Sequence, residues 1–152
     1  MFSRHRAATA GIGFAAFVQL HHRAYEQYAR ARLGDRALSR LVVSRVLRHA
    51  ELSWSSALSG DPSSFTWRVL RDSVTQARSE AALAPADELH RVLPDRAADA
   101  ALLHERLGMP AKAAAELMGL HEPELHVDLM VARRMLADLR NRNNTDPGGC
   151  TR

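Results

Sequence analysis

The apolar residues of this chain recur at the spacing of an α-helix, and turn-forming residues interrupt that spacing. Between Phe14 and Leu33 the apolar residues fall three or four positions apart, which places them on one face of a helix. Gly34 follows, and glycine is suited to the left-handed backbone that ends a helix. Ala, Leu and Arg dominate the composition while β-branched residues are sparse. The chain is therefore expected to be all-α.

Further helices are expected wherever the same spacing returns. Clear breaks occur at Ser59-Gly60-Asp61-Pro62, Gly108 and Gly119. We expect Ser63 or Ser64 to cap the third helix. The predicted helical segments are 14–33, 36–58, 64–81, 87–92, 95–107, 110–118 and 121–140.

These segments divide the chain into two helical units. Residues 14–81 are expected to form a three-helix bundle, and residues 89–140 a second domain built around a helix-turn-helix. Residues 82–88 are interpreted as a short linker. The ends, residues 1–13 and 141–152, are expected to be a flexible lead-in and a disordered tail.

The charge of the chain indicates a nucleic-acid partner only weakly. There are 21 Lys+Arg against 17 Asp+Glu, a formal net charge of +4. Lys112 is the single lysine, so the basic chemistry is that of arginine, which suits bidentate contact with phosphate or carboxylate. The charge is unevenly distributed. Residues 1–80 carry 12 arginines and 6 acidic residues (net +6), whereas residues 81–152 carry 9 basic and 11 acidic residues (net −2).

No catalytic or metal-binding motif stands out in the sequence. Cys150 is the single cysteine, which leaves no disulfide framework or thiolate zinc site and fits a reducing cytoplasm. The pairs His22 with Glu26 and His121 with His126 suggest no third ligand. No Ser/His/Asp or Cys/His arrangement and no phosphate-binding glycine loop is recognisable. We therefore expect that the chain is not an enzyme and that it binds neither a cofactor nor a metal ion.

The N-terminal run from Ala7 to Leu20 loosely resembles a signal peptide. It is rich in Ala and Gly, it continues into a polar helical pattern at His21, and no stretch reaches the length of a membrane span. Because of the resemblance of this run alone, an exported or membrane-associated basic helical protein is kept as a third hypothesis. The favoured expectation is a cytoplasmic protein with no membrane partner.

Two blocks of the sequence resemble the extracytoplasmic-function group of bacterial RNA polymerase sigma factors. The block similar to region 2 contains residues 25–37, 42–43, 46–47, 54, 57–58 and 65–70, and the block similar to region 4 contains 89–94, 101–104, 107–110, 114–120 and 132–136. Together they cover about residues 14–140 in the family's order. The most specific element is Ala115-Glu116-Leu117-Met118-Gly119, in which the small residue allows close helix approach and the glycine allows the turn.

The resemblance implies two domains with separate tasks. One would bind the RNA polymerase core and melt the −10 promoter element, and the other would read the −35 element with the second helix of its helix-turn-helix. The implied DNA-binding residues are Trp67, Arg68, Arg71 and Arg78 in the first half and His126, Arg133 and Arg134 in the second. The implied polymerase- or partner-binding residues are Arg40, Val43, Arg45, Val46 and Leu47. An anti-sigma protein or a partner sigma is a further candidate partner.

Some of these positions also have a plainer interpretation. Trp67 lies at helical spacing from Leu70 and Val74, which is typical of a core residue. The arginines of the same segment equally suit a solvated helix face. The sequence leaves these alternatives open.

Other positions depart from the family pattern. A helix face that is acidic in the family carries Arg40 and Arg45 here, and the expected recognition helix carries Glu124 and Asp128, which would repel phosphates. About ten residues, Ser79 to Glu88, separate the helices of the two halves and span at most about 33–36 Å, so the two halves are able to pack together. Two hypotheses follow. One is a sigma-like regulator that binds polymerase and promoter DNA, and the other is a degenerate sigma-like protein that acts through protein–protein contacts without independent promoter recognition.

Overall fold

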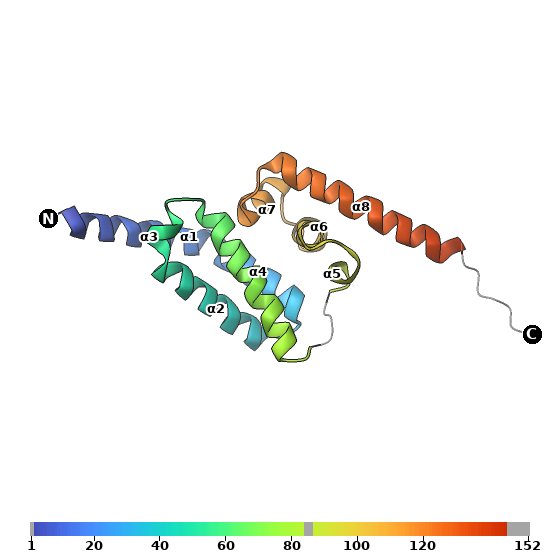
Figure 1. Ribbon diagram of the computed structural model, residues 1–152, viewed down its shortest axis with the longest axis horizontal. Helices are drawn as coiled ribbons and strands as arrows, with labels where there is room; N and C mark the ends of the chain where they lie inside the picture. Colours follow the sequence, from blue (N-terminus) through green and yellow to red (C-terminus); the bar gives the residue numbers. More distant parts are fainter. Residues whose placement is uncertain (1, 84–86, 146–152) are drawn as a thin grey trace, which may run out of the picture.

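The computed structural model describes residues 2–83 and 87–145, and every regular element within those ranges is helical (Figure 1). The N-terminal half contains α1 (Phe2–Leu33), α2 (Arg36–Leu52), α3 (Trp54–Ala57) and α4 (Pro62–Glu80). The C-terminal half contains α5 (Leu89–Val92), α6 (Asp95–Ala101), a π-helical turn (Leu102–Arg106), α7 (Ala111–Met118) and α8 (Glu122–Thr145). The predicted all-α class is confirmed.

Aspartate side chains cap the N-termini of two helices in the N-terminal half. The Asp35 carboxylate accepts a 2.9 Å hydrogen bond from a backbone N–H in the first turn of α2, and Asp61 accepts a 3.1 Å bond from the backbone N–H of Ser63 at the start of α4. Pro62 takes the first position of α4, where no N–H is needed. The cap predicted at Ser63 or Ser64 is therefore replaced by Asp61.

α1 begins at Phe2, so a helix occupies most of the segment predicted to be a flexible lead-in. A non-helical segment is predicted there because glycine, present at positions 11 and 13, lowers helix propensity. α1 nevertheless continues without a break to Leu33, and the left-handed Gly34 (φ 67°) ends it as predicted.

Two other helix boundaries also differ from the prediction. The segment expected as one helix over 36–58 is divided at Ser53 into α2 and α3. α8 continues to Thr145, five residues beyond its predicted end. The rest of the predicted tail, residues 146–152, lies outside the described residues, as do residues 84–86 of the predicted linker.

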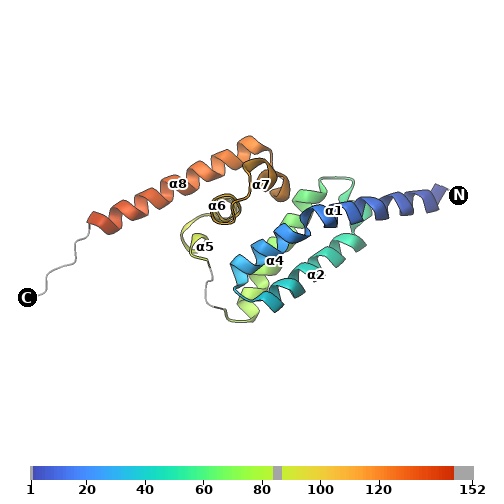
Figure 2. The same cartoon turned by 180° about the vertical axis from the view of Figure 1, so that it is seen from behind.

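α1, α2 and α4 pack against one another as a three-helix bundle, and the short α3 touches each of them. α7 and α8 form a helix-turn-helix that packs on α6. The N-terminal part of α1 and the C-terminal part of α8 project at opposite ends of the molecule (Figures 1 and 2). No described helix combines the length and the apolar character needed to cross a bilayer.

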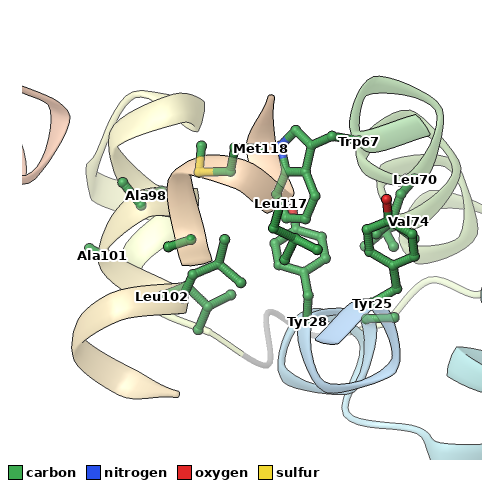
Figure 3. Close-up of a cluster of buried hydrophobic side chains, with 14 of the residues drawn as sticks. Tyr25, Tyr28, Trp67, Leu70, Val74, Ala98, Ala101, Leu102, Leu117 and Met118 are labelled. Atoms are coloured by element: carbon green, nitrogen blue, oxygen red, sulfur yellow. The ribbon is translucent and has the colours of Figure 1, made fainter. Parts of the chain in front are cut away.

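The two halves share one hydrophobic core. A continuous cluster of buried apolar side chains includes residues of α1, α2 and α4 as well as residues of α5 to α8. In Figure 3, Leu117 and Met118 of α7 lie between Trp67 and Tyr28 on one side and the residues of α6 and the π-helical turn on the other. The helix-turn-helix is therefore seated on the bundle rather than held apart from it.

Candidate functional surfaces

Five polar side chains form a buried network where α1 meets the C-terminal half. They are Tyr28, Arg32, Asp87, His90 and Asp99. The Tyr28 hydroxyl donates a 2.7 Å hydrogen bond to Asp99 Oδ1, and the two ring nitrogens of His90 lie 2.7 Å from Asp87 Oδ2 and from Asp99 Oδ1. Arg32 Nε lies 3.4 Å from Asp87 Oδ2. All five side chains are buried, so their mutual contacts offset the cost of removing charge from water.

This network is electrically balanced when His90 is protonated. Burial alone lowers the pKa of His90, but its hydrogen bonds with Asp87 and Asp99 outweigh burial and raise that pKa. Burial alone raises the pKa of Asp87, but the contacts with His90 and Arg32 outweigh it and lower that pKa. Two cations then face two carboxylates, and the Tyr28 hydroxyl stays neutral because burial and the nearby Asp99 raise its pKa. A polar cluster with no net charge thus joins the two halves.

A second polar contact joins α4 to the turn of the helix-turn-helix. Ser64 Oγ donates a 2.9 Å hydrogen bond to the carbonyl oxygen of Gly119. Gly119 has a φ of 68°, and a Cβ at this position would overlap both the hydroxyl and the backbone of Ser64. The glycine therefore serves the turn, as its position in the sequence predicted, and also the close approach of α4.

The predicted DNA-binding residues of the first half are only partly accessible. Trp67 is buried in the shared core, with its ring centroid 4.6 Å from that of Tyr28, so its ring does not face a DNA base. Of the two interpretations of Trp67 that the sequence allows, the structure therefore agrees with a core residue. Arg71 and Arg78 are half-buried, and Arg68 alone is exposed.

The predicted polymerase- or partner-binding residues of α2 divide into two sets. Val43, Val46 and Leu47 are buried in the bundle and cannot contact a partner, which corrects their assignment, because the helical repeat turns these three positions inward. Arg40 and Arg45 are exposed. The outward face of α2 is therefore basic.

Arg40 also belongs to a hollow between α1 and α2. The hollow has a volume of about 300 Å³, and Arg23, Arg30 and Arg36 line it together with Arg40, Glu26, Gln27 and Ser39. Within the described part of the chain none of these four arginines forms an ion pair. Unpaired guanidinium groups on one concave surface suit carboxylate or phosphate groups of a partner.

The outward face of α8 is apolar at its centre. Val127, Met130, Val131 and Met135 expose 55%, 67%, 39% and 36% of their surface. At 3.6 residues per turn, positions 127, 130, 131 and 135 fall within about half of the helix circumference, so they share one side of the helix. Apolar side chains therefore occupy the face that a recognition helix would turn toward DNA.

The predicted DNA-binding residues of α8 surround this apolar centre. His126 lies 3.5 Å from Glu122, and Arg133 lies 2.7 Å from Glu105 of the π-helical turn. Arg134 is exposed and has no carboxylate partner among the described residues. Of the three, Arg134 alone offers an unengaged cation.

The two acidic residues expected on the outward face of α8 have separate environments. Asp128 is 7% exposed and accepts a 2.7 Å hydrogen bond from Arg96 Nε, so it faces α6 rather than solvent. Glu124 is exposed, and its carboxylate accepts a 2.8 Å bond from the backbone N–H of His121. That bond caps the start of α8. The expected acidic pair on one face is thus corrected to Glu124 alone.

Sequence reasoning missed the buried network. The helical spacing places Tyr28 on the apolar face of the segment 14–33, and His90 lies in the block 89–94 that resembles region 4 without any role of its own. A signal was present in Asp99, which interrupts the alanine run 97–101 and so needs a buried partner. In the part of the chain that the structure describes, no three His, Cys, Asp or Glu side chains gather as metal ligands.

No family model and no curated protein matches this sequence. A solved structure does match it, described as "Structure of CnrH in complex with the cytosolic domain of CnrY", in which CnrH is an extracytoplasmic-function sigma factor. The two chains are 21% identical, with a TM-score of 0.57 over 90% of this chain and 95% of that chain. This chain has a sigma-factor-like fold. The architecture that the sequence resemblance implied is thereby supported at the level of the fold.

Proposed function

We propose that this chain is a cytoplasmic, sigma-factor-like transcription regulator that works through protein–protein contacts and does not read a promoter by itself. The outward face of α8 carries this proposal. A helix that reads the major groove presents hydrogen-bonding side chains to base edges and cations to phosphates. At that place α8 presents Val127, Met130 and Val131, with Glu124 preceding them.

The contact between the halves supports the same proposal. The family resemblance implies that the two halves act on separated promoter elements, and separation would open the shared core. Opening would expose Trp67 and Leu117, at about 1.5–3 kcal/mol for each large apolar side chain. It would also remove the Tyr28 hydroxyl from Asp99. The closed arrangement is thus favoured at rest, and a partner has to supply the free energy that opens it.

The partner surface that we assign is the basic side of the bundle. It consists of the arginine-lined hollow between α1 and α2, which includes Arg40, and of the exposed Arg45 on the side of α2 that faces α4. Because guanidinium groups pair with carboxylates in a bidentate geometry, the partner is expected to present an acidic surface. A polymerase or a second sigma-like protein with such a surface fits this assignment.

An active sigma factor that binds core polymerase and promoter DNA is the second candidate. The exposed Arg68 and Arg134 favour it, because each offers an unengaged cation to a phosphate. In this case α8 would contact the DNA backbone while making few base contacts.

Run-off transcription with core polymerase of the native host separates the two candidates. The proposal expects no initiation by this protein alone, no selective shift of promoter fragments in a gel, and altered initiation when a sigma factor of the host is added. Selective initiation by the protein alone would reject the proposal and establish the second candidate. Arg40→Glu with Arg45→Glu should remove the effect on the host sigma factor, whereas Arg91→Glu at an exposed position of α5 should leave it unchanged.

A further inference from the structure

The apolar centre of α8 has the properties of a self-association surface. Val127, Met130, Val131 and Met135 span about 12 Å along the helix. In Figures 1 and 2, α8 runs along an outer edge of the molecule with the other elements on one side of it. Its opposite face is buried against the C-terminal half through Leu125, Leu129 and Ala132. The apolar centre is therefore uncovered, and contiguous exposed apolar surface of this kind marks an interaction site.

Opposite charges flank the apolar centre along α8. Glu122 and Glu124 lie before it, and Arg134, Arg140 and Arg142 lie within or after it, all exposed. Asp138 is an acidic exception in the second part, while Arg133 is engaged by Glu105. A second copy of α8 that runs antiparallel brings the acidic end of each helix beside the basic part of the other. The same charge pattern would place like charges together in a parallel pair.

We propose that two copies of this chain associate through α8 in an antiparallel pair with two-fold symmetry. A two-fold axis beside residue 129 places Val127 opposite Val131 of the second copy and Glu124 opposite Arg134 of the second copy. The remainder of each chain lies on the buried side of its own α8, so the two bodies lie on the outer sides of the helix pair. A closed interface of this kind uses the same patch on both chains.

A second copy fits this surface better than a DNA duplex or an unrelated helix. The charge pattern of α8 complements itself on reversal, whereas DNA would meet exposed apolar side chains and the Glu124 carboxylate. A second copy of this chain is thus the partner of the α8 face. The pair rests on the proposed function in one respect, because both require that a protein and not DNA covers this face.

Sedimentation equilibrium of the full chain tests the pair. We expect a monomer–dimer equilibrium in which Met130→Asp raises the Kd at least about tenfold, because a charge would be buried at the centre of the interface. Leu52→Asp is the matched control, since Leu52 is 78% exposed and ends α2, which lies apart from α8 (Figure 1). It should leave the Kd unchanged. A chain that stays monomeric at about 100 μM, or a dimer that Met130→Asp does not weaken, overturns the proposal.

A charge exchange tests the antiparallel arrangement. Arg134→Glu alone and Glu124→Arg alone should each weaken the dimer, and the double variant should restore it, because the exchanged charges again face opposite partners. Glu124 also caps α8, so each variant is compared with the native chain by circular dichroism to confirm that α8 is intact. Weakening without recovery in the double variant, with α8 intact, overturns the antiparallel pair.

Gel-shift titration of the same preparations separates failure of this inference from failure of the proposed function. A monomeric chain that binds no promoter rejects the pair and leaves the proposed function standing. A chain that shifts a promoter fragment selectively rejects the proposed function, whatever its oligomeric state.

Discussion

The hydroxyl of Tyr28 in α1 donates a 2.7 Å hydrogen bond to Asp99 Oδ1 in α6, a residue 71 positions away in the other half of the chain. The same carboxylate oxygen lies 2.7 Å from His90 Nε2. Asp99 has no exposed surface, so these two contacts offset the cost of removing its carboxyl group from water. The relative placement of the two halves is therefore set by a buried polar contact as well as by apolar packing.

Tyr28→Phe should lower the free energy of unfolding by about 1.5–3 kcal/mol, because a hydrogen bond to a buried carboxylate is lost while the ring packing stays. Urea unfolding measures the change. Tyr25→Phe is the matched control, since the Tyr25 hydroxyl is buried without a hydrogen-bonding partner among the described residues. Its removal should be neutral or slightly stabilising. Equal losses of unfolding free energy for both variants would show that the Tyr28–Asp99 hydrogen bond makes no particular contribution to stability.

Gly119→Ala should destabilise the protein more than Gly108→Ala. Both glycines have positive φ, 68° and 71°, so each substitution carries about 1–2 kcal/mol of backbone strain. At Gly108 a Cβ meets open space, whereas at Gly119 it overlaps Ser64 of α4. The difference between the two variants in thermal unfolding therefore reports the contact between the halves. Equal effects would mean that α4 does not rest on this turn.

Leu117→Ala should destabilise the chain by about 2–5 kcal/mol, because Leu117 is buried beside Trp67 and Tyr28 and its truncation leaves a cavity between the halves (Figure 3). Leu58→Ala, at an exposed position, should change the stability by less than about 0.5 kcal/mol. Urea unfolding followed by Trp67 and Trp54 fluorescence measures both. A small loss at Leu117 would contradict a shared core.

The helical repeat and the turn residues were sufficient to predict the all-α class and most helix ends, because both depend on local sequence. The start of α1 was harder to predict, since glycine propensity suggested coil where the chain continues as helix. The buried network was not predictable from spacing, because Tyr28 and Asp99 meet only through tertiary packing. The same holds for Asp128, whose charge is turned inward to Arg96. Local patterns place residues on a face, and only packing decides what covers that face.

Two histidines give the stability of this protein opposite dependences on pH. Contacts with Asp87 and Asp99 raise the pKa of His90 despite its burial. Its contribution to stability is therefore complete below the unfolded value of about 6.5 and is lost as the pH rises through the folded pKa. Burial lowers the pKa of His21, with Glu116 opposing the shift. Its contribution is therefore present above about 6.5 and is lost as the pH falls through the folded pKa.

His90→Gln should consequently be less stable than the native chain near pH 6, and the difference should shrink as the pH rises from about 6.5 through the raised folded pKa of His90. Loss of the His90 proton then leaves the native network with an excess of negative charge. Urea unfolding at a series of pH values measures this. His21→Asn is the control, because it should alter only the acid side of the profile. A stability difference between His90→Gln and the native chain that stays constant from pH 6 to pH 9 would show that proton binding by His90 does not support the joined halves.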